Sequence, residues 1–479
     1  IVSKDVNFMQ HLLLGNGIDI QFGGPAYTSR YIIKRIKYKA LQDGYDELFG
    51  YKISANELIN LLNSFVIETN SILCGDYDCY ANDKDTLEAL ADFKDRYKHQ
   101  VDQIDDIMLE DWLFVVHMFF LKNTDLEENR QAAVQGFERL LLDAIYNDGL
   151  VQELYKFMKK PVKKFLFQFD SIFTLNYDNN IEALTKKTVY HLHGDFSELA
   201  DSENEKTVSG YIRKSDNTTV YQEGLQHCYC NALLNYSGRL KKKRINECDA
   251  ANKALEELVE KCRVDETILE DVKSVNVSVY AQVKTKIAHP ELMACSDYHY
   301  NDLCTISGEL HILGMSPNND AHIFDAILNN SQLTKVVFYY RDPKHKEFIE
   351  ANYSRDLFEC IEVEDLWRRL NCLTPRYNCN YTFPKEIDNF VKAFNALSMD
   401  EISTNQVKEA LKQITRGDMV RLCKLVKADI QKRNPKHMST NVKDFIKQNA
   451  SISYIALQQG ILPTVLYLIC VMNFDVIKD

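Results

Sequence analysis

The chain has 479 residues, of which 45% are hydrophobic and 26% are charged, and its formal net charge is -12. This composition is ordinary for a globular protein, and the length allows two or three domains. The excess of acidic residues argues against a general nucleic-acid binder, because affinity for phosphates comes from dense Lys and Arg, so we expect no direct nucleic-acid binding.

Six short apolar runs predict the strands of a parallel sheet, because most of them end in Gly, Asn, Asp or His. In such sheets the ligand binds at the carboxyl ends of the strands. We therefore expect an α/β fold with a Rossmann-like parallel sheet. The six runs are 10–14, 171–175, 188–192, 309–313, 335–340 and 360–363.

The first run leads into Gly15-Asn16-Gly17-Ile18-Asp19, and Gly23-Gly24-Pro25-Ala26-Tyr27 follows. Two glycines directly after a buried strand predict a sharp turn into a helix. Glycine suits positive φ and lets the phosphates of a ligand approach the backbone. The amides of the turn and of the helix N-terminus would then point at an anion. A plain tight turn would explain the same glycines.

A long, mostly helical segment separates the first two predicted strands. It is too long for a strand-to-helix connection, so we expect an inserted helical region at about 35–165. A second insertion is expected at about 198–303, where the chain becomes polar and charged. The predicted organisation is one domain over 1–374 that contains both insertions, and a helical C-terminal region over 375–479.

The second strand ends in Thr174-Leu175-Asn176-Tyr177-Asp178. An Asn and an Asp two residues apart at a strand end can place polar groups in one crevice. Local capping is the competing interpretation, because Asn and Asp often cap the helix that follows. Capping accounts for Asp178 more readily than for Asn176.

The third strand ends in His191-Leu192-His193-Gly194-Asp195. Alternation along a strand puts His191 and His193 on the same face. A histidine near its ordinary pKa exchanges a proton near neutral pH, and Gly194 would permit close approach of a ligand. His193 is therefore a candidate catalytic residue.

The fourth strand ends in Leu313-Gly314-Met315-Ser316, and Pro317-Asn318-Asn319-Asp320 follows. The small residues of this turn would let a nucleotide approach the backbone. Ser316 and Asp320 are equally suited to cap the helix expected near Ala321.

None of the 13 cysteines forms a C-x-x-C pair. We therefore expect no metal, with Cys228, Cys230 and His227 as a weak alternative, and free thiols in a reducing cytosol. The most apolar stretch, 461–474, contains Pro463 and is shorter than the roughly 20 residues of a membrane span. We expect a cytoplasmic protein without membrane contact.

Taken together, the four motifs resemble the sirtuin superfamily. The pattern of that family is G-A-G-I-S, three residues and G-I-P-D-F-R, followed in order by T-x-N-x-D, H-G and a G-x-S turn. The opening with Asn16 and Asp19 looks even more like the AbiH-type abortive-infection proteins. The segments that match are 15–19, 23–27, 174–178, 193–194 and 314–316.

The chain departs from sirtuin deacetylases in lacking their two C-x-x-C pairs, and Ala26 and Thr28 stand where the pattern has Asp and Arg. These departures argue against protein deacetylation. The chain is similar instead to bacterial anti-phage members without the zinc module, which are commonly NAD+ hydrolases. The resemblance implies that NAD+ is the substrate, that the bond between nicotinamide and ribose is cleaved, and that no metal takes part.

The resemblance also implies roles for individual residues. Asn176 would orient the ribose or a water, and His193 would accept a proton. Because a diphosphate would repel the Asp19 carboxylate, Asp19 is expected to form a cap or to bond the ribose. The nucleotide-binding residues implied are Gly15, Asn16, Gly17, Asp19, Tyr27, Asp178, Gly314 and Ser316.

The biological role implied by the resemblance is depletion of NAD+ in abortive anti-phage defence. A homo-oligomer and a partner such as a HerA-type ATPase are implied in the same way. The competing hypothesis is a nucleotide-binding sensor or assembly subunit that binds its ligand without turnover. The presence of both Asn176 and His193 favours the enzyme.

Overall fold

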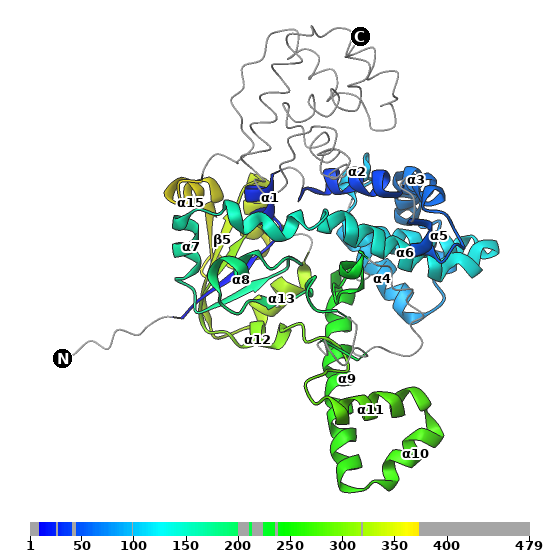
Figure 1. The fold of residues 1–479 in the computed structure, drawn as a ribbon. Coiled ribbons are helices and arrows are strands. Elements are labelled where there is room, and N and C mark those ends of the chain that lie inside the picture. The colour runs from blue at the N-terminus through cyan, green and yellow to red at the C-terminus, as the bar shows by residue number, and fades with distance from the viewer. Residues whose placement is uncertain are drawn as a thin grey trace, which may run out of the picture.

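The computed structural model describes residues 9–372 apart from 25–26, 41–44, 98, 200–209, 213–223, 235–237 and 318–319. Within this part of the chain, six strands form one parallel sheet, and helices surround it (Figure 1). The predicted α/β class with a Rossmann-like parallel sheet is confirmed. The predicted region 375–479 and the apolar stretch 461–474 lie outside the described residues.

Each of the six predicted apolar runs forms a strand. The strand order is β3-β2-β1-β4-β5-β6, so the chain builds outward from β1 in one direction and then returns to build in the other. The third strand is shorter than predicted and ends at His191. The strands are β1 (Gln10–Leu14), β2 (Ser171–Thr174), β3 (Tyr190–His191), β4 (Gly308–Leu313), β5 (Leu333–Tyr340) and β6 (Phe358–Glu362).

The two faces of the sheet are buried under separate sets of helices, as the continuous apolar runs of its central strands require. One face packs against α1 (Gly17–Gly23), α7 (Lys160–Leu166), α8 (Asn180–Thr185) and α15 (Val363–Arg369). The other face packs against α12 (Tyr300–Thr305), α13 (Ala321–Asn329) and α14 (Pro343–Asn352).

The first insertion is helical, as predicted, and has its own hydrophobic core. The Phe65 ring lies 5.3 Å from Trp112 and 6.2 Å from Phe137, between centroids, and all three side chains are fully buried. Such a core lets the inserted helices keep a fixed position beside the sheet. The helices are α2 (Ser29–Ala40), α3 (Ala55–Cys74), α4 (Lys84–Arg96), α5 (Leu109–Lys122) and α6 (Glu127–Tyr146).

The second insertion contains the longest described helix, α9 (Gly238–Val264). Residues near its start pack on the sheet core, and residues near its end form a small separate core with α11 (Val277–Ala288). Together with α10 (Thr267–Val275), these helices extend away from the sheet (Figure 1).

Two further expectations concern cysteines and membranes. Cys248 and Cys295 are joined in a disulfide, so the prediction of free thiols is wrong for this pair. Their Cα atoms come within 5.2 Å through packing of segments that are 47 residues apart, which no local spacing reveals. Eight other described cysteines are free.

None of the helices in the described residues is both long and apolar enough to cross a membrane.

Candidate functional site

A cavity of about 520 Å³ lies at the carboxyl edge of the sheet. The turns that follow β1, β2, β3, β4 and β5 form one side of it, and residues 106–110 of the first insertion form another. The cavity lies at the carboxyl ends of the neighbouring strands β1 and β4. From β1 the chain continues to β2 on one side of the sheet, and from β4 it continues to β5 on the other side. Open parallel sheets bind ligands at such a point. Of the residues predicted from the sequence, those that line it are Gly15, Asn16, Gly17, Asn176, His193, Gly314 and Ser316.

The glycine turn has a different physical reason from the one predicted. Neither Gly15 nor Gly17 has a positive φ. A Cβ on Gly15 would lie 2.7 Å from the carbonyl oxygen of Gly314, and one on Gly17 would collide with the Gly314 backbone. The glycines therefore let the turns after β1 and β4 pack against each other.

Two backbone amides of this turn already donate hydrogen bonds within the protein. Gly15 N donates to the Leu313 carbonyl at 2.9 Å, and Gly17 N donates to the Gly314 carbonyl at 2.8 Å. These two N–H groups are therefore not free for a phosphate, contrary to the prediction. The carboxamide of Asn16 donates to the Tyr27 carbonyl at 2.8 Å, which fixes the entry to the helix that follows.

Asn176 is held in place from behind the cavity. Its Nδ2 donates to Asp19 Oδ2 at 3.1 Å and lies 3.4 Å from the Gly15 carbonyl. Burial raises the pKa of Asp19 well above its ordinary value, and the neighbouring Asp178 carboxylate adds to the shift. Asp19 Oδ1 and Asp178 Oδ2 are both buried without another partner among the described residues, so a proton shared between the two carboxyl groups would satisfy both.

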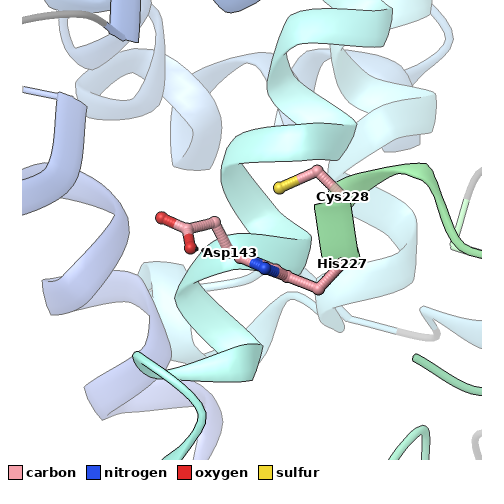
Figure 2. A group of neighbouring side chains, drawn as sticks. All are labelled: Asp143, His227 and Cys228. Carbon is pink, nitrogen blue, oxygen red and sulfur yellow. Dashed lines mark hydrogen bonds and ion pairs between the residues drawn. The ribbon is translucent and has the colours of Figure 1, made fainter. Parts of the chain in front are cut away.

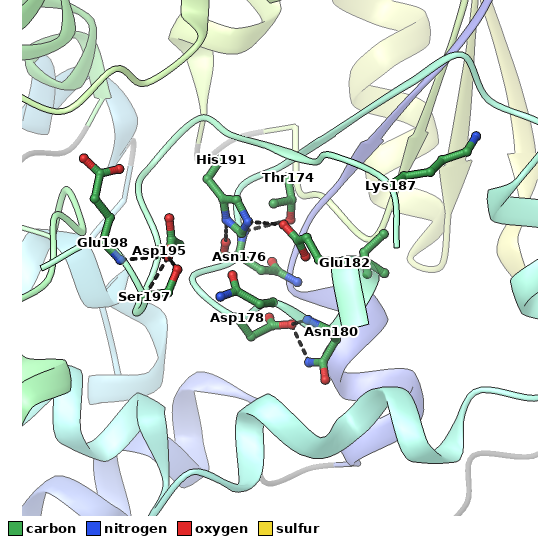
Figure 3. Close-up of polar contacts among 12 residues, drawn as sticks. Thr174, Asn176, Asp178, Asn180, Glu182, Lys187, His191, Asp195, Ser197 and Glu198 are labelled. Atoms are coloured by element: carbon green, nitrogen blue, oxygen red, sulfur yellow. Dashed lines mark hydrogen bonds and ion pairs between the residues drawn. The ribbon is translucent and has the colours of Figure 1, made fainter. Parts of the chain in front are cut away.

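Asp19, Asp178 and Tyr27 do not line the cavity. Asp178 accepts hydrogen bonds from the backbone and side chain of Asn180, which fits the local capping interpretation (Figure 3). The Tyr27 hydroxyl lies 3.4 Å from Asn147 Nδ2 inside the core of the first insertion. Contacts of these three residues with a nucleotide stay a prediction.

The two histidines of the third strand have different surroundings. His191 Nδ1 contacts the Asn176 carbonyl at 3.0 Å and Nε2 contacts Glu182 at 2.7 Å (Figure 3). Burial alone would lower the pKa of His191, but the Glu182 carboxylate raises it. His191 thus ties the Asn176 turn to α8. The strand ends at His191, so the predicted alternation does not extend to His193, which lines the cavity.

His193 belongs to a buried network that the sequence did not reveal. Its Nδ1 lies 3.4 Å from Lys241 Nζ, and its Nε2 lies 3.1 Å from His322 Nε2 and 3.8 Å from Asp320 Oδ1. Burial lowers the pKa values of both His193 and His322, and the Lys241 charge lowers them further. We call His193, Asp320 and His322 the cavity cluster.

Close packing also explains why residue 194 is a glycine. Its φ is 84°, and a Cβ would lie 2.5 Å from Asn231 Oδ1 in the second insertion. The backbone of Leu233 donates to the His193 carbonyl at 2.9 Å in the same region. The His-Gly pair therefore locks the second insertion onto the end of β3.

The cavity cluster could in principle hold a metal ion, because it offers two imidazoles and a carboxylate whose ligand atoms lie within 4.8 Å of one another. A metal bound to His193 Nε2 would force the ring proton onto Nδ1. That proton would point at the Lys241 ammonium, which is itself only a donor and lies 3.4 Å away. The residues present therefore do not favour a cation.

A second group of possible metal ligands lies where the two insertions meet, with Asp143 from the first and His227 and Cys228 from the second (Figure 2). We call Asp143, His227 and Cys228 the insertion cluster. Asp143 Oδ1 contacts His227 Nε2 at 2.7 Å, while Oδ2 contacts Lys39 Nζ at 2.8 Å and the Tyr45 hydroxyl at 2.6 Å. Cys230, which the sequence grouped with His227 and Cys228, is not part of it.

Both carboxylate oxygens of Asp143 in the insertion cluster have close polar partners. Burial alone would raise the pKa of Asp143, but the His227 hydrogen bond and the Lys39 charge hold it below its ordinary value. Burial raises the pKa of the Cys228 thiol, so the thiolate that a metal needs is disfavoured. These interactions attach residues 226–229 to α6.

Sequence reasoning missed Glu110, Lys241 and His322. Glu110 lines the cavity from α5, and Lys241 is buried on α9 with its Nζ 4.0 Å from Glu110 Oε1. Lys241 lies in a basic run that looks like a solvated helix face. No local pattern distinguishes it from its neighbours.

No model of a known protein family matches the chain, and no curated protein or solved structure matches it either.

Proposed function

We propose that the protein hydrolyses NAD+ at the bond between nicotinamide and ribose. One observation carries this proposal: the four motif turns converge on one cavity at the point of the sheet where dinucleotides bind in Rossmann-like folds. The resemblance of these motifs to sirtuin-like NAD+ hydrolases gives the chemistry.

The cavity suits a ligand with both polar and charged parts. Arg341, which follows β5, lines it and is exposed, and it has no ion-pair partner among the described residues. Because the amides of Gly15 and Gly17 are committed to carbonyls, Arg341 is the cation we assign to the diphosphate. Tyr339 and Trp367 line the same part of the cavity and offer aromatic surface.

The opposite part of the cavity holds the groups for bond cleavage. Asn176 and His193 reach it from the ends of β2 and β3, and Glu110 and Asp320 bring carboxylates to the same cavity. The transition state for loss of nicotinamide resembles an oxocarbenium ion, as in glycoside hydrolysis, and carboxylates stabilise such a cation. Asn176 would orient the ribose in this scheme.

The direct test is to incubate the purified full chain with NAD+ and to measure nicotinamide release by chromatography. Release that requires Asn176 supports a hydrolase. Saturable binding of NAD+ without any nicotinamide supports the sensor alternative instead. The defence role, a homo-oligomer and a HerA-type partner belong to this proposal through the resemblance alone, so the assay is run with and without such a partner.

A further inference from the structure

We propose that Asp320, rather than His193, accepts the proton of the attacking water. This inference deepens the proposed function and rests on it. The reasons are the hydrogen bonds that occupy the His193 ring, the position of the Asp320 carboxylate in the cavity, and the charges that surround that carboxylate.

Both ring nitrogens of His193 already take part in hydrogen bonds, one as acceptor and one as donor. An ammonium group only donates, so Lys241 Nζ donates to His193 Nδ1, 3.4 Å away. The neutral ring must then carry its proton on Nε2, which donates to His322 Nε2 at 3.1 Å. His322 keeps its own proton on Nδ1, and this atom is buried without a partner among the described residues. His193 has no lone pair left for a water.

Asp320 has the free acceptor that His193 lacks. It lies at the start of α13, but its side chain makes no capping hydrogen bond. The carboxylate lines the cavity with 14% of the side chain exposed, and its Oδ1 lies 3.8 Å from His193 Nε2. No described donor hydrogen-bonds to it, so its oxygens are available to a water in the cavity.

The charges around Asp320 suit a base that works near neutral pH. Burial raises the pKa of Asp320 to about 6, the Lys241 and Arg96 cations oppose this rise, and the Glu110 carboxylate adds to it. The Tyr177 hydroxyl near Asp320 and Glu110 stays protonated, because burial raises its pKa well above the ordinary value. A general base is most effective when its pKa lies close to the working pH.

The chemical step balances without any further reactant. The C–N bond between ribose and nicotinamide breaks, and its electron pair goes to the ring nitrogen of nicotinamide, which becomes neutral. The oxygen of water forms the new bond to the ribose carbon, and a water proton passes to the Asp320 carboxylate. Release of that proton to solvent leaves ADP-ribose, nicotinamide and H+ as products. His193 contacts the substrate and, through Lys241 and His322, keeps a fixed orientation beside Asp320.

Glu110 is the competing base, because it also brings a carboxylate to the cavity. It lies 4.0 Å from Lys241 Nζ and 34% of its side chain is exposed. Its predicted effect is electrostatic: removing its charge lowers the pKa of Asp320, because a like charge is lost. Glu110→Gln therefore shifts the acidic limb of the rate profile to lower pH without abolishing it, whatever the loss in kcat from the missing carboxylate.

The experiment compares Asp320→Asn, Glu110→Gln and Asp325→Asn with the wild-type full chain. Asp325 is the matched control, since it is exposed on the same helix and does not line the cavity. We measure kcat for nicotinamide release from pH 5 to 8, and binding of ADP-ribose by calorimetry. Asp320→Asn is expected to lower kcat at least about 10²-fold, to bind ADP-ribose within about threefold of wild type and to abolish the acidic limb near pH 6.

The outcomes separate the two proposals. Wild-type activity combined with an Asp320→Asn variant that keeps its rate and its acidic limb overturns the assignment of Asp320 alone. A Glu110→Gln variant that loses the acidic limb transfers the role to Glu110 and overturns it as well. A wild-type protein that binds NAD+ but releases no nicotinamide at any pH overturns the hydrolase and the base together.

Discussion

The cavity cluster and the insertion cluster each contain an aspartate beside a histidine, but the two carboxylates differ in the hydrogen bonds they accept. Asp143 in the insertion cluster has His227, Lys39 and Tyr45 as close partners. Asp320 in the cavity cluster accepts no hydrogen bond from a described residue and borders a cavity. Five of the six residues are buried and Asp320 is only partly exposed, so burial alone does not distinguish the clusters.

This difference teaches which buried polar groups carry function. A fully partnered carboxylate contributes to the stability of the fold, and its pKa falls below the ordinary value. A carboxylate without a partner costs free energy through desolvation, and its pKa rises. Such an arrangement persists in a protein when the exposed acceptor serves a ligand. Substitutions in the two clusters should therefore change different measurable quantities.

The largest expected effect is on stability in the insertion cluster. Asp143→Ala removes the partner of Lys39, whose side chain is only 5% exposed, and leaves a buried cation largely uncompensated. We expect a loss of about 3–5 kcal/mol in the free energy of unfolding, measured by urea denaturation.

Asp148→Asn is the matched control for this substitution. Asp148 also pairs with Lys39, but its side chain is 31% exposed. It should cost less than about 1 kcal/mol. Equal losses in the two variants would contradict the view that Asp143 is the structural partner.

The next effect is on catalysis in the cavity. His193→Ala and Asn176→Ala should each reduce nicotinamide release at least about 10²-fold, because both residues position the substrate and a small misplacement at the reacting centre costs about this much. Both side chains are buried, so the rate is normalised to the folded fraction from circular dichroism. A folded His193→Ala protein with full activity would remove this residue from the mechanism.

A smaller effect separates the two clusters by pH. The pKa values of His193 and His322 are lowered, so the unfolded chain binds protons that the folded chain refuses, and stability falls as pH drops below about 6.5. The lowered pKa of Asp143 leads to loss of stability only below about pH 4. His322→Gln should therefore make the loss of stability from pH 7 to pH 5 shallower, by up to about 1.4 kcal/mol per pH unit.

Asp143→Asn provides the contrast for the pH experiment. It should leave the slope of stability between pH 7 and pH 5 unchanged and alter the slope below about pH 4. Denaturation curves at pH 7, 6, 5 and 3.5 test both variants. Identical slopes in wild type and His322→Gln between pH 7 and pH 5 would refute the role of the cavity histidine.

The smallest expected effect is that of metal removal. Lys241 lies against the cavity cluster and Lys39 against the insertion cluster, so we expect neither to hold zinc. Nicotinamide release should be the same with and without a chelator, and elemental analysis of untagged protein should find less than stoichiometric zinc. Stoichiometric zinc that is lost in His193→Ala would place a metal in the cavity cluster.

The sequence predicted the sheet well because strand signals are local. Short apolar runs that end in small or polar residues identified all six strands of the described residues, and the motif turns after β1, β2, β3 and β4 indicated the edge at which the cavity lies. Seven of the ten predicted site residues line that cavity. The order of the motifs along the chain was enough, because parallel strands bring their carboxyl ends to one edge.

Only the tertiary structure decided what surrounds each of these groups. Glu110 and Lys241 come from two separate insertions, and His322 from a helix after β4, yet they meet at His193 and Asp320. The glycines after β1 are needed against Gly314, almost 300 residues away, and Asp19 owes its shifted pKa to Asp178 as well as to burial. Strand periodicity and turn chemistry depend on neighbours in the chain, whereas burial, hydrogen-bond partners and pKa depend on neighbours in space, so the sequence located the site and the packing determined its chemistry.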